Sequence, residues 1–182
     1  MASVNAKFSL SSLPKFPNQA QLKKLEKNHI LSYSEVESDA ALQSLKFHIF
    51  GLHPKKCQIA LSKISRYENY QEYLGVVKKS TYENKVIYLE LSHLLLPFDM
   101  SMKFKMERVS KPGHYKFSFN QGFLSGLQGD VIISKQDKRC LFVGRSYWKG
   151  KDSGISDTIF SFFTKQLTKI TMETLFKISK TY

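Results

Sequence analysis

Five ionisable side chains between residues 88 and 147 are of types that could do chemistry inside a pocket. They are Tyr88, Glu90, His93, Arg145 and Tyr147. A buried acid–base pair, such as Glu90 with His93 or with Arg145, could move protons to and from a substrate. The tyrosine hydroxyls could orient the polar end of a ligand. Each residue lies in an expected strand, but the sequence pattern does not show which face of that strand points inward. The alternative is therefore that these side chains face water.

The histidines, cysteines and glycines form no recognisable catalytic or metal-binding motif. The five histidines lack the spacing of zinc ligands, and the chain has no H-E-x-x-H, paired C-x-x-C or G-x-S-x-G sequence. The glycines at 122–129 lie between expected strands rather than before a helix, which disfavours a phosphate-binding loop. Cys57 and Cys140 are expected to be two separate buried side chains. The sequence therefore predicts no metal, no cofactor and no catalytic residue.

Apolar side chains provide a second candidate site, because aromatic residues and methionines alternate with polar residues along the expected strands. The residues expected to line a cavity for a hydrophobic ligand are Met100, Met102, Phe104, Phe117, Phe119, Phe142, Trp148, Phe160, Phe163 and Leu167. Methionine side chains adapt to ligands of varied shape, which favours a cavity. The alternative is a solid core, since any half-buried sheet shows the same alternation.

The charge of the chain is strongly positive. It carries 28 Lys+Arg against 15 Asp+Glu, a formal net charge of +13. Such a field attracts nucleic acid, anionic lipid and acidic proteins without choosing among them. Basic pairs such as Lys78-Lys79 and Lys138-Arg139 stand at expected strand ends and turns. If these pairs lie together on one edge of the domain, that edge would dock on an anionic membrane. The alternatives are contact with RNA phosphates and dispersed charges that only keep the protein soluble.

Length and composition limit the class of protein. A chain of 182 residues is one globular domain with a short appendage, and 14 Phe with 9 Tyr exclude a disordered chain. The apolar run at 94–98 is far shorter than the roughly 20 residues of a membrane-spanning helix. Two cysteines are too few for a disulfide framework. No intact signal peptide is visible at 1–13, which favours a cytoplasmic protein, with a processed periplasmic protein as the alternative.

The expected elements divide the chain at residue 45. Residues 1–44 are expected to be an appendage with one short helix at 18–28 and an acidic loop at 34–39. Residues 45–182 are expected to form the ligand-binding domain. Their alternating and helical patterns succeed one another without a repeat or a low-complexity segment.

Within that domain the pattern predicts a strand at 45–49, a helical stretch at 55–73 that bends at Asn69 into two short helices, and six strands. The strand at 98–109 is the clearest, because apolar and polar residues alternate there with period two. The other five strands are expected at 76–81, 85–95, 114–121, 126–135 and 139–149. Strands in unbroken succession predict an antiparallel sheet.

The last expected element is a long helix from Ser156 to 179, with Ser156 as its N-cap. Its expected apolar side includes Phe160, Phe163, Leu167, Ile170 and Ile178. The sheet has one apolar face, which this helix is long enough to cover. The segment at 149–155, rich in Gly and Ser, is expected to be a flexible gate beside it.

Three stretches carry a family resemblance. Residues 65–74 (SRYENYQEYL) resemble a D-x-E-x-Y-x-x-(F/W) stretch, residues 98–104 (FDMSMKF) a long central strand, and residues 122–129 (GFLSGLQG) a G-x-(F/L)-x-x-(L/M)-x-G-x-W turn. Val131 stands near the position where many members carry tryptophan. Together, and in this order, they resemble the START / polyketide cyclase-like (SRPBCC, helix-grip) superfamily, closest to its coenzyme-Q-binding and cyclase-like branch.

The resemblance covers residues 45–180 and implies an α+β fold, in which a curved antiparallel sheet of about seven strands wraps round the long C-terminal helix. It also implies a hydrophobic tunnel between sheet and helix, because most members bind lipids, sterols, quinones or polyketides. We therefore expect the chain to bind a hydrophobic small molecule such as a lipid or quinone, with transport of that molecule as an extension of binding. The alternatives are a small cyclase-like or hydrolase-like enzyme that uses the same cavity, and an RNA- or ribosome-binding protein that uses the basic surface.

Overall fold

The computed structural model describes residues 18–92 and 99–180, and the expectations placed on His93 and Phe98 lie outside these ranges. In chain order the elements are α1 (Gln19–Glu26), β1 (Leu31–Asp39), β2 (Leu42–His53), α2 (Cys57–Ile64), η2 (Tyr67–Asn69), α3 (Tyr70–Tyr73), β3 (Val77–Glu83), β4 (Val86–Leu91), β5 (Met100–Met106), β6 (Gly113–Gly122), β7 (Gln128–Gln136), β8 (Arg139–Lys151) and α4 (Asp157–Ile178). No helix within the described residues is long and apolar enough to cross a membrane.

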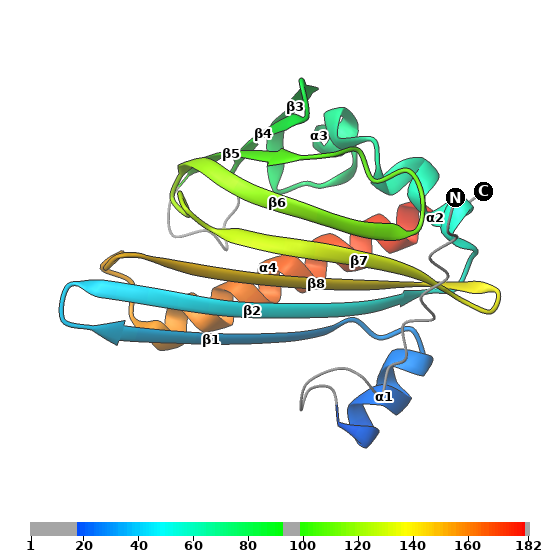
Figure 1. Ribbon diagram of the computed structural model, residues 1–182, viewed down its shortest axis with the longest axis horizontal. Coiled ribbons are helices and arrows are strands. Elements are labelled where there is room, and N and C mark those ends of the chain that lie inside the picture. The colour runs from blue at the N-terminus through cyan, green and yellow to red at the C-terminus, as the bar shows by residue number, and fades with distance from the viewer. Residues whose placement is uncertain (1–17, 93–98, 181–182) are drawn as a thin grey trace, which may run out of the picture.

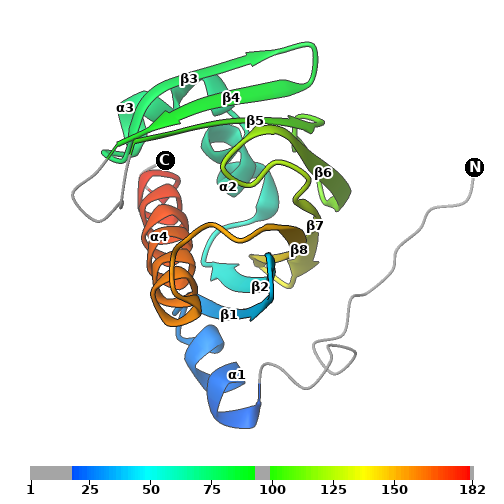
Figure 2. The same cartoon turned by 90° about the vertical axis from the view of Figure 1, so that its left-hand side faces the viewer.

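The strands form one antiparallel sheet of eight in the order β1-β2-β8-β7-β6-β5-β4-β3. Figure 1 views the sheet with α4 behind it, and Figure 2 shows the strands curving from β1 and β2 round to β3 and β4, with α4 on the inner side of the curve. We call the side that faces α4 the inner face and the opposite side the outer face. The expected α+β fold with a curved sheet, two short helices and a long C-terminal helix is confirmed.

Alternation along β5 is as regular as the sequence predicts. Met100 and Met106 are buried on the inner face, whereas Ser101, Lys103 and Lys105 are exposed. The pleat of a strand turns successive side chains to opposite sides. The side of every residue on the neighbouring strands then follows from its pairing with β5.

Residues 34–39 form most of β1 instead of the expected loop, and residues 42–44 belong to β2. The boundary expected at residue 45 therefore falls inside a strand, and this part of the expected appendage supplies an edge of the sheet. The sequence concealed β1 because an inward position is occupied by Ser34, which is buried although polar. Successive side chains of β1 still point to opposite faces, but apolar and polar residues do not alternate along it.

Cys57 and Cys140 form a disulfide that joins the start of α2 to β8, with their Cα atoms 4.7 Å apart. The expectation of two separate buried cysteines is therefore wrong. The residues are 83 positions apart in the sequence. They meet because the pairing of β2 with β8 sets His53 opposite Cys140, and α2 begins only a short turn after His53.

The long helix α4 packs against β1 and β2 and against α2 and α3. Its side chains Phe160 and Phe176 are buried. Close approach to β2 requires Gly51, because a Cβ there would lie 2.8 Å from Cζ of Phe176. The position of Ile170 was predicted wrongly, since it is 45% exposed. At about 100° per residue, Ile170 lies on the same side of the helix as the exposed Ile159.

Candidate ligand site on the inner face

Aromatic and methionine side chains of β5 and β6 face α4. Met102, Phe104 and Phe119 lie on the inner face, and the rings of Phe104 and Phe119 stack with centroids 4.7 Å apart. A register shift between Lys103 and Phe104 sets Phe104 opposite Phe119 and Met102 opposite Gly122. These three apolar side chains are only partly buried although they point away from the outer surface.

The predicted ligand-binding residues divide into two groups by exposure. The partly buried group packs against the core without being enclosed by it: Met102, Phe104, Phe117, Phe119, Phe163 and Leu167. The other group is closed off from solvent: Met100, Phe142, Trp148 and Phe160.

The closed group has well-defined packing partners. Phe142 contacts the ring of Phe176, and Trp148 lies edge-on to Phe160. The indole Nε1 of Trp148 donates a hydrogen bond of 3.0 Å to the carbonyl of Ser125. These four residues close one part of the inner face, whereas the side chains of the other six remain partly exposed to solvent.

Three apolar residues that the prediction omitted share the character of the partly buried group. They are Phe123, Leu124 and Met172. Phe123 and Leu124 follow β6 in the turn before β7, and the ring of Phe123 lies 5.6 Å from that of Phe160 on α4. Two adjacent apolar residues in a glycine-rich turn are the sequence signal that could have identified them, because turn residues are usually polar.

The ionisable candidates within the described residues lie on the outer face. Tyr88 donates a 2.6 Å hydrogen bond to Glu90, and both alternate with the buried Ile87 and Leu89 of β4. Tyr147 is 50% exposed. The pairings therefore bring none of these groups to the partly buried apolar residues, and His93 lies outside the described ranges.

Arg145 takes part in an ion-pair cluster on the outer face. Its Nε lies 2.9 Å from Oδ1 of Asp130, and Nε2 of His114 lies 2.6 Å from Oδ2 of the same carboxylate. Burial acts to raise the pKa of Asp130, but the hydrogen bonds from Arg145 and His114 outweigh it and hold the pKa below its ordinary value. The carboxylate is therefore ionised at neutral pH and holds Arg145 in place.

The segment at 149–155, which was expected to be a flexible gate, is held against β2 by hydrogen bonds. The amide of Gln43, itself 1% exposed, donates to Oδ1 of Asp157 at 2.9 Å and to the carbonyl of Ile155 at 3.0 Å. The hydroxyl of Ser153 donates to Oε1 of Gln43 at 2.6 Å. Asp157 also accepts from the hydroxyl of Ser38 at 2.6 Å. These bonds fix the start of α4 relative to β1 and β2.

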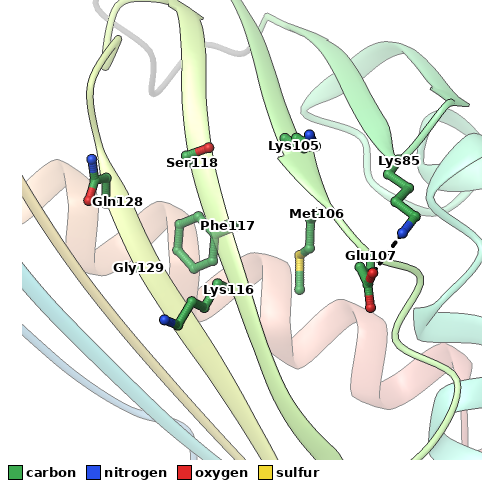
Figure 3. A pocket seen from close by; sticks show the side chains of 9 residues that line it. All are labelled: Lys85, Lys105, Met106, Glu107, Lys116, Phe117, Ser118, Gln128 and Gly129. Atoms are coloured by element: carbon green, nitrogen blue, oxygen red, sulfur yellow. Dashed lines mark hydrogen bonds and ion pairs between the residues drawn. The ribbon is translucent and has the colours of Figure 1, made fainter.

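Two hollows lie on the outer face. Figure 3 shows the larger one, of about 590 Å³, with Lys105, Lys116 and Ser118 around it and α4 behind the sheet. The smaller one, of about 530 Å³, adjoins Arg145 and Tyr147. Met106 and the partly buried Phe117 also line the larger hollow, whereas none of the predicted ligand-binding residues lines the smaller one.

Comparison with known proteins identifies the fold. No family model and no curated protein sequence matches the chain. Among solved structures it is similar to a START superfamily protein from Mycobacterium smegmatis, with 8% identity, a TM-score of 0.60, and coverage of 74% of this chain and 97% of that one. It is also similar to the Zhui aromatase/cyclase from Streptomyces, with 5% identity, a TM-score of 0.59, and coverage of 75% and 94%.

A third similar structure is a STAR-related lipid transfer protein from Xanthomonas axonopodis, with 10% identity, a TM-score of 0.53, and coverage of 81% of this chain and 98% of that one. At such identities the likeness establishes the fold. The chain has the START / polyketide cyclase-like, helix-grip fold, as the sequence resemblance implied.

Proposed function

We propose that the chain binds and carries a hydrophobic small molecule, such as a lipid or a quinone, between the inner face of the sheet and α4. The observation that supports this proposal is the partial exposure of inward-facing apolar side chains on β5, β6 and α4, among them Phe104, Phe119 and Leu167. In a solid core such side chains are fully enclosed, because protein interiors are packed about as densely as organic crystals. Incomplete enclosure leaves apolar surface that a ligand would cover.

The driving force would be the removal of apolar surface from water, at about 25 cal/mol per Å². The methionine and aromatic side chains suit this role, because Met102 adapts its shape and the rings of Phe104 and Phe119 offer large flat surfaces. The enzyme alternative lacks comparable support. The pair Glu90 and Arg145 lies on the outer face, so it provides no buried acid–base pair beside the apolar residues.

Two tryptophan substitutions in β5 test the proposal. Met102→Trp adds volume at a partly buried inner position, and Met100→Trp adds the same volume at a buried inner position of the same strand. We expect Met102→Trp to fold with a stability close to that of the wild type and to lose ligand binding, because the ring occupies the ligand's place. Met100→Trp should lose about 1–3 kcal/mol of stability through overpacking.

The probe for binding is an NBD-labelled fatty acid, followed by its fluorescence, with native mass spectrometry of the purified protein as a second measurement. The proposal predicts enhanced probe fluorescence with the wild type and its loss with Met102→Trp. If Met102→Trp destabilises the protein as much as Met100→Trp does, and the wild type leaves the probe fluorescence unchanged, the inner face is solid and the proposal fails.

A further inference from the structure

The two hollows of the outer face are parts of one groove. They share Lys116, Gln128 and Gly129, and together they reach from Lys85 at the start of β4 to Lys46 on β2. We call this the outer groove. The six strands that it crosses are separated by five interstrand spacings, which amount to about 24 Å. The groove is therefore long enough for an extended ligand.

Strand pairing accounts for the side chains that line the outer groove. Lys105 on β5 pairs with Ser118 on β6, and Gln128 on β7 pairs with both Ser118 and Tyr147. Tyr147 on β8 in turn pairs with Lys46 on β2. Because side chains opposite each other in a sheet share a face, this row crosses the whole outer face between β5 and β2.

The outer groove carries more positive than negative charge. Its cations are Lys46, Lys85, Lys105, Lys116 and Arg145, and its acids are Glu107 and Asp130.

Both acids are already engaged. Glu107 lies 2.7 Å from Nζ of Lys85, and Asp130 holds Arg145. Among the residues that the structure describes, no acidic side chain pairs with Lys105 or Lys116, which stand on the adjacent strands β5 and β6. Two neighbouring ammonium groups without a counter-charge favour an anion between them.

Exposed aromatic rings accompany these charges. Tyr147 is 50% exposed beside Gln128 and Lys46, and Tyr33 on β1 is 39% exposed, with its ring edge-on to His48. A sheet face that presents aromatic rings between cations is the arrangement with which proteins bind single-stranded nucleic acid, because bases stack on the rings while phosphates contact the cations. Gln128 adds amide groups that can hydrogen-bond to a base edge.

We propose that the outer groove binds single-stranded nucleic acid, with phosphates on Lys105 and Lys116 and a base stacked on Tyr147. A membrane fits the outer groove less well. Three exposed apolar side chains that could enter a bilayer, Ile159, Phe162 and Ile170, lie on α4, which is on the opposite side of the sheet. A fourth, Leu42 at the start of β2, does not line the outer groove. Met106 and Phe117 also line the larger hollow, but the lysines and Tyr147 that would contact the nucleic acid lie on the outer face. The inference therefore does not rest on the proposed ligand binding.

The charge arm of the test compares two double variants with the same net charge. Lys105→Gln with Lys116→Gln removes the unpaired cations of the outer groove, and Lys138→Gln with Lys177→Gln removes two exposed cations from the β7–β8 turn and from α4. Binding of a short labelled oligouridylate to the full chain is measured by fluorescence anisotropy at several salt concentrations. We expect the groove variant to bind more weakly, and the slope of log K against log salt concentration to become shallower by about 0.7 for each lysine removed. The control variant should bind as the wild type does.

The stacking arm uses Tyr147. Tyr147→Ala should weaken oligouridylate binding about tenfold without changing its salt slope, and Tyr147→Phe should restore the affinity because the ring is kept. Equal weakening by both double variants would overturn the proposal. It would also be overturned if the wild type ignored oligouridylate and instead bound phosphatidylserine vesicles through Lys105 and Lys116, or if it bound a duplex as tightly as a single strand with no effect of Tyr147→Ala.

Discussion

His53 is fully buried beside the C-terminal end of α4. Its Nε2 lies 3.0 Å from Oγ of Ser179, and the backbone N–H of Lys55 donates to its Nδ1 at 3.1 Å. An imidazole that accepts at Nδ1 and donates at Nε2 is neutral. Burial is the main reason that the pKa of His53 is lower than its ordinary value.

The buried histidine makes stability depend on pH. Between the lowered pKa of His53 and the ordinary value of about 6.5, the unfolded chain binds a proton that the folded chain does not. The free energy of unfolding should therefore fall as the pH drops below about 6.5, by at most about 1.4 kcal/mol per pH unit for one histidine. Urea denaturation between neutral pH and pH 5 measures this slope.

The matched variant is His53→Gln, which cannot titrate. Its stability should depend less on pH than that of the wild type. His48, whose pKa burial also lowers, contributes in both proteins and cancels in the difference. Identical slopes for the two proteins, together with a His53 pKa at its ordinary value by NMR, would contradict the neutral buried state.

At the level of elements, the disulfide between Cys57 and Cys140 closes a loop of 83 residues that contains α2, α3 and strands β3 to β7. Cross-linking restricts the unfolded chain more than the folded one, and by loop length this bond is worth about 4.5 kcal/mol. Both cysteines are buried, so the bond also fastens α2 to β8. Disulfides of this kind persist in oxidising compartments and are rare where thiols are kept reduced.

Removal of the disulfide should weaken the fold measurably. The double variant Cys57→Ala with Cys140→Ala should lose about 4.5 kcal/mol of unfolding free energy, measured by urea denaturation. A reductant should destabilise the wild type and leave the double variant unaffected. Two free thiols in the unreduced wild-type protein, with no effect of the reductant, would show that the bond does not form.

At the level of the whole molecule, the sheet separates two candidate sites. The partly buried apolar residues lie on its inner face with α4, and the outer groove lies on its other face. Because successive residues of a strand point to opposite faces, Met102 and Lys105 belong to the same strand β5 but to different sites. A substitution at one position should therefore leave the other site intact.

We expect ligand binding on the inner face and nucleic-acid binding in the outer groove to be independent of each other. Met102→Trp should abolish binding of the fatty-acid probe and leave the affinity for oligouridylate unchanged within about twofold, since separated sites are usually additive. The Lys105→Gln, Lys116→Gln variant should show the reverse. Loss of both activities in either variant, in a protein that remains folded by circular dichroism, would mean that both ligands use one site.

Several features were predictable because they depend on local pattern alone. Strict alternation identified β5, and a long stretch without Gly or Pro identified α4. The order of these patterns, with the resemblance they carry, predicted the fold class. The strand β1 escaped prediction because Ser34 occupies an inward position where an apolar residue would have revealed the alternation.

The sequence by itself determined which residues of a strand share a face, because the backbone pleat enforces a period of two. It did not determine which of the two faces α4 covers, and so it left the sides of Glu90 and Arg145 open. Only the tertiary structure decided this, through strand pairings and helix contacts between residues far apart in the chain. The Cys57–Cys140 bond was missed for the same reason, since covalent pairing depends on distance in space and the sequence records only distance along the chain.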